Sequence, residues 1–310
     1  MSSNTRPHKW KAHSAVLLTN IFFGANFSAV QYIAKHGVPA FGLNVIRVGV
    51  SSFLFWLLIL IIPQKISIRK KDVGRFLLCA ITGVVINQLL FIKGLTLTLS
   101  THASLLILVT PIFITFIAAW LGRESLNISK ILGLVLGVAG SVILVLQKEP
   151  VGAGTNILLG NILVILNAIS YAFYFVLVKP LMREYHPFEV IRWLFTLGFI
   201  FMLPIGWTEF HSIQWHALTV TDFIILGTIV FFATFLAYLF NLYGISILGA
   251  SVTGAYIYTQ PIFAGIIAVF VMGERMTLQK LLAAALIIGG VLLVNRKTKR
   301  VIYETEQQLP

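Results

Sequence analysis

Charged residues are scarce in this sequence, and cysteine is almost absent. Only 11% of the residues are charged, whereas a typical soluble domain has about 25%. The single cysteine, Cys79, excludes an intramolecular disulfide and a cysteine-based zinc site. The sequence also lacks a phosphate-binding glycine motif, a nucleophile elbow and histidines at metal-ligand spacing. We therefore expect a protein that is not an enzyme, with no catalytic residue, metal site or cofactor.

Hydrophobic residues make up 58% of the chain, and its mean hydropathy is +0.93. These values are typical of a protein that crosses the membrane several times. The net charge of +13 could suggest nucleic acid as a partner. However, the basic residues lie between long apolar runs rather than on one folded face, so we expect a lipid bilayer and no nucleic acid.

Ten apolar runs are long enough to cross a bilayer, which takes roughly 20 residues. The longest uncharged stretch, from Phe223 to Gly273, is too long for one helix, and the glycines Gly244 and Gly249 indicate a turn within it. The first run is longer than a typical signal peptide core and is interpreted as a permanent span. The predicted helices are 12–34, 39–62, 74–95, 99–122, 128–147, 156–179, 188–208, 222–244, 248–272 and 277–295.

Lysine and arginine concentrate in alternate connecting segments. Residues 1–11, the segment around Arg69 and the tail 297–310 belong to the basic set. Because basic residues favour the cytoplasmic side, we expect both termini in the cytoplasm and a multi-pass protein of the plasma (inner) membrane.

The second half of the sequence repeats a pattern of the first half at an offset of 150 positions. The matching residues are Pro111 and Pro261, Glu124 and Glu274, Lys130 and Lys280, and Gly140 and Gly290. We expect two five-helix repeats, 12–147 and 156–296, joined by an external linker at 148–155. Because five is odd, the second repeat would enter the membrane inverted, so the fold class is an all-α protein of ten transmembrane helices in two inverted repeats. Such repeats support alternating access.

Two segments carry a family resemblance, TPIFITFIAAWLGRESLNISKILGLVLGVAGSVILV in the first half and QPIFAGIIAVFVMGERMTLQKLLAAALIIGGVLLV in the second. They resemble the two EamA-type repeats of the drug/metabolite transporter superfamily. Phe23-Gly24-Ala25-Asn26-Phe27 resembles the start of the first repeat. The resemblance covers about residues 12–296 and implies ten helices, a central cavity and transport of small metabolites such as amino acids. Neither segment has the proline that the family pattern places after the glutamate.

Polar side chains within the predicted helices are the candidates for a binding site. Each is costly in lipid and should face a cavity or a neighbouring helix. Amide and phenol groups between apolar walls would suit a small amphipathic solute, whereas the alternative role is hydrogen bonding between helices. The candidate substrate-binding residues are Asn20, Asn44, Arg47, Asn87, Asn167, Tyr171, Tyr174, Tyr238, Asn241, Tyr256 and Gln260.

Arg47 is the one formal charge that falls well within a predicted helix. As a functional residue it would bind a carboxylate or phosphate of the substrate, and the alternatives are a structural partner or snorkelling towards the membrane surface. No aspartate or glutamate falls near the middle of a span. This favours facilitated diffusion, or coupling through a group other than a carboxylate, over a carboxylate proton relay.

The repeated residues suggest moving and fixed parts. Pro111 and Pro261 are candidate hinges, since each removes a helix hydrogen bond, with a static kink as the alternative. We expect Glu124 and Glu274 to pair locally with a neighbouring arginine or to cap their loops. The glycine-rich helices 128–147 and 277–295 are interpreted as scaffold that could also form a homodimer surface.

These features distinguish between three possible functions. A secondary transporter that moves small organic metabolites, namely amino acids or related solutes and in the export direction, fits the duplication best. The alternative is an integral-membrane enzyme that acts on a lipid or lipid-linked substrate, which would need acids, bases or metal ligands gathered at one membrane face. A channel would need charged rings or carbonyl filters, and the sequence indicates neither.

Overall fold

Every regular element of the described residues is helical. The computed structural model describes residues 9–61, 67–121, 128–147, 154–248, 253 and 256–295. The α-helices of the first half are α1 (Lys9–Lys35), α2 (Ala40–Leu57), α3 (Val73–Ala80), α4 (Ile86–Leu97), α5 (Ser100–Leu106), α6 (Thr110–Trp120) and α7 (Ile128–Leu146). Those of the second half are α8 (Ile157–Val178), α9 (Leu181–Glu184), α10 (Pro187–His211), α11 (Val220–Val230), α12 (Ala237–Leu248), α14 (Gln260–Phe270) and α15 (Leu278–Asn295).

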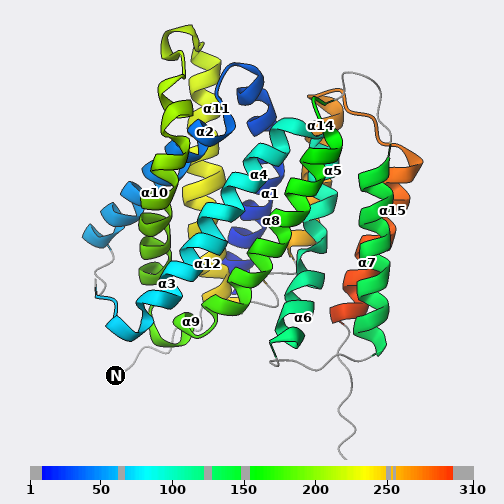
Figure 1. The fold of residues 1–310 in the computed structure, drawn as a ribbon, viewed down its shortest axis with the longest axis horizontal. Helices are drawn as coiled ribbons and strands as arrows, with labels where there is room; N and C mark the ends of the chain where they lie inside the picture. Colours follow the sequence, from blue (N-terminus) through cyan, green and yellow to red (C-terminus); the bar gives the residue numbers. More distant parts are fainter. Residues whose placement is uncertain are drawn as a thin grey trace, which may run out of the picture.

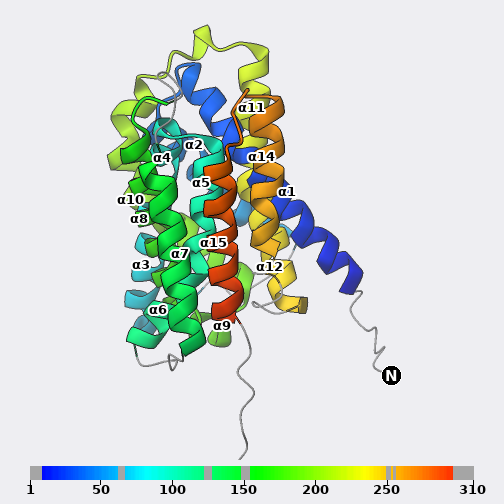
Figure 2. The ribbon, with the colours of Figure 1, turned by 90° about the vertical axis from the view of Figure 1, so that its right-hand side faces the viewer.

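The helices form one bundle of roughly parallel and antiparallel segments (Figure 1). We call the end at which α1 begins the lower end, and the end at which α1 finishes the upper end, as they lie in Figure 1. Figure 2 shows the same bundle from the side, with α7 and α15 next to each other at the front.

Eight helical segments of the described residues are long and apolar enough to cross a membrane, and they coincide with the first eight predicted runs. Two shorter apolar helices, Tyr256–Phe270 and Leu278–Val294, fall within the last two predicted runs. The prediction of an all-helical, multi-pass membrane protein is therefore confirmed, and the count of ten helices stays a prediction.

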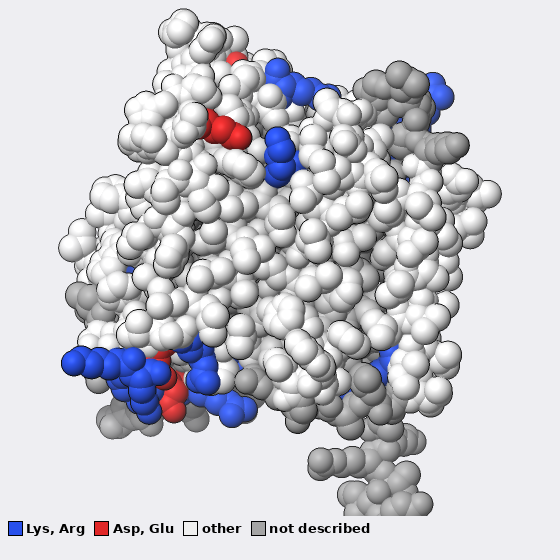
Figure 3. All heavy atoms as spheres, in the orientation of Figure 1, with Lys and Arg blue, Asp and Glu red and all other residues white. Residues whose placement is uncertain are grey.

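Apolar side chains cover the outside of the bundle at mid-height. In the view of Figure 3, lysine, arginine and the acidic residues gather towards the two ends, and the broad band between them is almost free of charge. Phe116, Val135 and Leu292 are among the large hydrophobic residues exposed on the surface. This distribution fits a protein whose middle is surrounded by lipid chains, because apolar surface there is not exposed to water.

The two halves share their irregularities as well as their regular helices. A π-helical segment follows α3 at Ile81–Val85, and another follows α11 at Phe231–Leu236, 150 positions later. A 3-10 segment precedes α6 at Ile107–Val109, and another precedes α14 at Tyr256–Thr259. Because π-helical and 3-10 turns within long helices are uncommon, their repetition indicates that the duplication preserved local backbone structure.

Helices α7 and α15 pack against each other in antiparallel directions along a seam of glycines. A methyl group on Gly290 would lie 2.5 Å from the carbonyl oxygen of Gly133, and one on Gly140 would lie 2.8 Å from that of Ala283. These two contacts are equivalent under the 150-residue offset, as a two-fold relation between the halves requires. The predicted close backbone approach therefore occurs within one chain.

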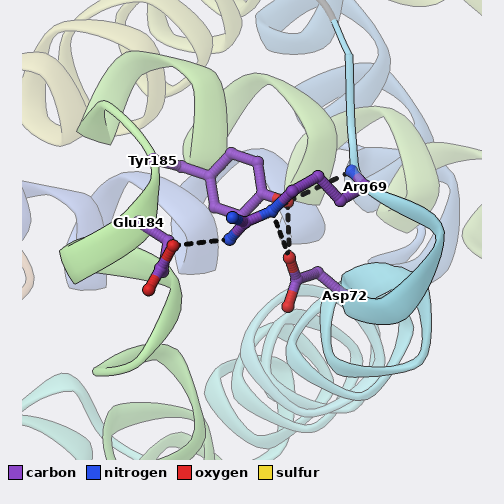
Figure 4. A network of polar contacts seen from close by, with 4 residues as sticks. All are labelled: Arg69, Asp72, Glu184 and Tyr185. Atoms are coloured by element: carbon purple, nitrogen blue, oxygen red, sulfur yellow. Dashed lines mark hydrogen bonds and ion pairs between the residues drawn. The ribbon is translucent and has the colours of Figure 1, made fainter.

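A network of charged residues joins the two halves at the lower end (Figure 4). Arg69 Nη2 lies 2.6 Å from Glu184 Oε2, and Arg69 Nε lies 3.0 Å from Asp72 Oδ2. The Tyr185 hydroxyl donates to the same Asp72 oxygen at 2.7 Å. Hydrogen bonding to Glu184, and then to Tyr185, raises the pKa of Arg69 above its ordinary value. The Arg69 guanidinium therefore stays charged throughout the physiological pH range.

Candidate functional site

A cavity of about 120 Å³ lies in the middle of the bundle. Helices of both halves line it, chiefly α1 and α4 from the first half and α8 and α12 from the second. The 3-10 segment before α6 contributes Ile107, and α6 contributes its first residue, Thr110. In the same way, the 3-10 segment before α14 contributes Ile257, and α14 contributes its first residue, Gln260. The cavity thus forms where the two halves meet and where the helices are least regular.

Most of the predicted binding residues line this cavity. They are Asn20, Arg47, Asn87, Asn167, Tyr171, Tyr238, Asn241 and Gln260. Their side chains carry amides, phenols and one guanidinium, and none of the described residues that line the cavity is acidic. This described lining is therefore polar in places but has no negative charge to attract a cation.

Three predicted binding residues lie outside the cavity lining. Asn44 is fully buried and its Nδ2 donates to the carbonyl oxygen of Gln88 at 3.1 Å. Tyr174 packs directly on Gly83, where an added methyl group would overlap its ring. Tyr256 shares a hydrogen bond of 2.8 Å with His13 Nδ1. These side chains join neighbouring helices, which is the alternative role that buried polar groups have in membranes.

The polar candidates predicted from the sequence did not include the aromatic part of the cavity lining. Phe23 and Phe27 of α1 line the cavity, together with Phe91 of α4 and Phe175 of α8. The sequence held one signal for two of them, because Phe23 and Phe27 belong to the Phe-Gly-Ala-Asn-Phe motif that carries the family resemblance. Asn26 of the same motif also lines the cavity. The rings of Phe27 and Phe91 meet edge to face at 5.5 Å between centroids.

A close crossing of α1 and α14 positions one pair of amides. A methyl group on Gly24 would lie 2.6 Å from Phe263 Cβ, so only glycine allows the two helices to approach this closely. One turn away, Gln260 Nε2 donates to Asn20 Oδ1 at 2.9 Å. The pair leaves few free donors at this wall, because Asn20 Nδ2 already donates to the carbonyl oxygen of Val16.

Arg47 lies at the cavity wall in the middle of α2, with only 2% of its surface exposed. Its Nε donates to Thr234 Oγ1 at 3.0 Å, and its Nη1 has no hydrogen-bond partner in the part of the chain that the structure describes. Among the described residues, the ion pairs found involve Arg69 at the lower end and not Arg47. The guanidinium therefore carries a buried positive charge without a counter-ion in this part of the chain.

The second π-helical segment supplies the partner of Arg47. The Thr234 hydroxyl donates to the carbonyl oxygen of Ile229, five residues earlier, at 2.8 Å. Its oxygen is therefore oriented to accept from Arg47. Tyr238, four residues after Thr234, makes a further polar contact, because its hydroxyl accepts from Gln88 Nε2 at 3.1 Å. Because this hydroxyl accepts from Gln88, its own proton remains available for a ligand.

A group of buried and partly buried polar residues lies above the cavity, and we call it the upper polar layer. It consists of Ser28, Gln31, Thr98, Ser100 and Glu274. Gln31 Nε2 donates to the carbonyl oxygen of Thr98 at 2.5 Å, and Ser100 Oγ donates to Gln31 Oε1 at 2.7 Å. On α1, Ser28 of this layer directly follows the cavity residue Phe27, and Gln31 lies about one turn after Phe27.

Glu274 ties the second half of the chain to this layer. Its Oε1 accepts from the Ser100 amide at 2.8 Å, and its Oε2 accepts from the Thr101 amide at 3.0 Å and from the Thr101 hydroxyl at 2.7 Å. The expectation of a local role for Glu274 was therefore wrong, because it caps a helix of the other half of the chain. Glu124, for which the same role was expected, lies outside the described residues.

A second cavity, of about 580 Å³, lies on the other side of the upper polar layer. Gln31, Thr98 and Glu274 line it, together with Lys35 near the end of α1. The layer thus separates the central cavity from a space near the upper end of the bundle.

Pro111 and Pro261 each occupy the first turn of a helix, α6 and α14 respectively, directly after a 3-10 segment. Proline is tolerated in this position because the amide it lacks would have no partner there. Both prolines therefore mark breaks beside the cavity, and their role as hinges stays a prediction.

A multi-pass helical bundle in two related halves, with a polar cavity between them, is the architecture of a membrane transporter. The sequence pattern of the EamA-like transporter family matches this chain at residues 10–146 and again at residues 158–296. The chain belongs to this family, which confirms the resemblance seen in the sequence.

Several relatives are themselves described as transporters. An uncharacterized transporter, YetK, of Bacillus subtilis is 26% identical over 85% of this chain and 80% of its own length. A protein of Streptantibioticus cattleyicolor named "Probable terminal-alkyne amino-acid exporter" is 25% identical over 93% of this chain and 94% of its own. A solved crystal structure superposes with a TM-score of 0.60 at 16% identity, covering 91% of this chain and 96% of that one, and it shows the shared fold.

Proposed function

We propose that this protein is a secondary transporter that moves small organic metabolites, namely amino acids or related solutes, across the plasma membrane by alternating access. The observation that carries this proposal is the central cavity, lined by polar and aromatic side chains from both halves of the chain. A site between two related halves suits alternating access because rocking one half against the other exposes it to either side in turn. The named amino-acid exporter among the relatives supports the substrate class and the export direction.

The proposal includes ten transmembrane helices in two inverted five-helix repeats, with both termini in the cytoplasm. The antiparallel packing of α7 and α15, with contacts equivalent under the 150-residue offset, supports the inversion. In this arrangement the upper end faces outwards, and the upper polar layer closes the outer side of the cavity. Pro111 and Pro261 would serve as bending points beside the site.

Transport is proposed to run down the substrate gradient. A proton-coupled carrier commonly uses a carboxylate near the middle of the membrane, and no acidic residue is found among the described residues that line the cavity. The expected result is flux that saturates with substrate and does not require a proton gradient.

Reconstitution into liposomes tests the proposal directly. Radiolabelled amino acids, nucleosides, sugars and polyamines would be offered with and without a proton gradient, and saturable uptake of at least one class is expected. A variant that tests the cavity is Asn241→Trp, which places a large ring into it from a partly exposed position. This variant should fold and lose flux. An absence of saturable flux of every compound with the wild-type protein would contradict the proposal.

A further inference from the structure

We propose that Arg47 binds the carboxylate of the substrate, so that the cavity accepts small carboxylates and amino acids with an apolar skeleton and rejects cations. This inference rests on the proposed transport function and gives its substrate class. It depends on the electrostatics of the central cavity rather than on any relative.

The first step is the charge of the cavity. Among the described residues that line the cavity, Arg47 is the one lysine or arginine, and no aspartate or glutamate accompanies it. A buried cation without a counter-ion is costly in a low-dielectric interior. An anion that enters the cavity relieves this cost, whereas a cation adds to it. The site therefore favours a ligand with one negative charge.

The second step is the orientation of the guanidinium. Its Nε is held by Thr234 at 3.0 Å, while Nη1 has no partner among the described residues. Arginine binds carboxylates through two parallel N–H groups, and a guanidinium fixed at one nitrogen loses less freedom on binding. The Tyr238 hydroxyl, whose oxygen accepts from Gln88, adds a donor to the same cavity.

The third step distinguishes a carboxylate from a phosphate. A phosphate monoester carries about two negative charges near neutral pH and has three strong acceptor oxygens. A single guanidinium and a phenol match the one charge and two oxygens of a carboxylate more closely. We therefore assign a carboxylate, and phosphate becomes an outcome of the test.

The fourth step concerns the rest of the ligand. Phe23, Phe27, Phe91 and Phe175 give the cavity a largely aromatic wall that suits an apolar skeleton. Asn26 Oδ1 is buried and has no hydrogen-bond partner among the described residues, so it is an acceptor that the ammonium group of an amino acid would satisfy. The lining therefore suits zwitterions and monocarboxylates, in which the negative group lies at Arg47.

The test compares ligands that share one skeleton and differ in charge. Leucine, 4-methylpentanoate, 4-methylpentanamide and 3-methylbutylamine would be added to the purified protein, with inorganic phosphate as a fifth probe. Binding is measured by thermal stabilisation and by calorimetry. The two carboxylates should bind about 10-fold or more tightly than the amide and the amine, which corresponds to about 1.4 kcal/mol. Phosphate should bind no better than the amide.

The variant arm uses Arg47→Gln and a matched control, Arg192→Gln. Both arginines have 2% of their surface exposed, and both have unpaired nitrogen atoms, but Arg192 does not line the cavity. Arg47→Gln should abolish the preference for carboxylates, and Arg192→Gln should keep it. If Arg47→Gln does not fold, the comparison of the five probes on the wild-type protein still decides the question.

The outcomes separate this inference from the transport function. Saturable flux in liposomes without a preference for carboxylates would overturn the role of Arg47 and leave transport standing. Carboxylate binding without flux of any tested compound would support the role of Arg47 and contradict transport. Equal binding of the amine or of phosphate, or an unchanged preference in Arg47→Gln, would overturn the inference.

Discussion

Glu274 offers the sharpest test of how the cavity is closed at the upper end. Its carboxylate accepts three hydrogen bonds from Ser100 and Thr101. Glutamine at this position keeps one acceptor oxygen and directs its amide hydrogens towards amide donors, so at least one bond is lost. A hydrogen bond to a charged group contributes about 1.5–3 kcal/mol. Glu274→Gln should therefore shift the balance towards an open upper end by about 10-fold to 150-fold.

Cysteine labelling can measure this shift, because the chain has one cysteine to replace. In a Cys79→Ala background, Thr110→Cys places a nearly isosteric reporter in the cavity lining. A membrane-impermeant maleimide added outside intact cells should label this position slowly while Glu274 is present. The rate should rise by at least about 10-fold in Glu274→Gln, the low end of the range above.

Glu209→Gln is the matched control. Glu209 Oε2 accepts from the amides of Phe41 and Gly42 at the start of α2, so it also caps a helix at the upper end. It lines neither cavity. This variant should lower thermal stability without changing the labelling rate. Equal labelling of wild type and Glu274→Gln, or an equal increase in Glu209→Gln, would refute the role of Glu274 in closing the upper end.

Three further predictions concern the seam, the arginine and the topology. Gly290→Ala should lower the melting temperature, because its methyl group would meet α7, whereas Gly289→Ala has open space and should not. Thr234→Val should weaken carboxylate binding several-fold because it removes the acceptor of the Arg47 Nε, and Thr234→Ser should not. Tags on the two termini should lie on the same side of the membrane, and tags on opposite sides would contradict ten helices.

The sequence predicted the individual helices well because hydropathy acts locally. A run of about 20 apolar residues has few alternatives to a membrane-spanning helix. The predicted segments 12–34, 74–95 and 188–208 each fall within a helical segment of the structure. The repeated prolines likewise gave the positions of the breaks that precede α6 and α14.

The faces of the helices were predicted less well. The spacing of Tyr171 and Tyr174, about one turn, predicts a shared helix face. In the structure, Tyr171 lines the cavity and Tyr174 packs on Gly83. Residues three apart on a helix differ by about 60° in direction. A polar stripe therefore leaves open which of its members reaches a cavity, and the rotation of α8 against α3 and α4 decides it.

The sequence by itself determined the class of this protein: an apolar, duplicated helical chain of the EamA-like transporter family. Composition and repetition suffice for that because each acts along the chain. Only the tertiary structure decided that Glu274 caps a helix 174 positions away, and that Arg47 lies buried beside Thr234 without a counter-ion among the described residues. Both contacts join residues of different halves, and their formation depends on how the two halves pack, which no local pattern encodes.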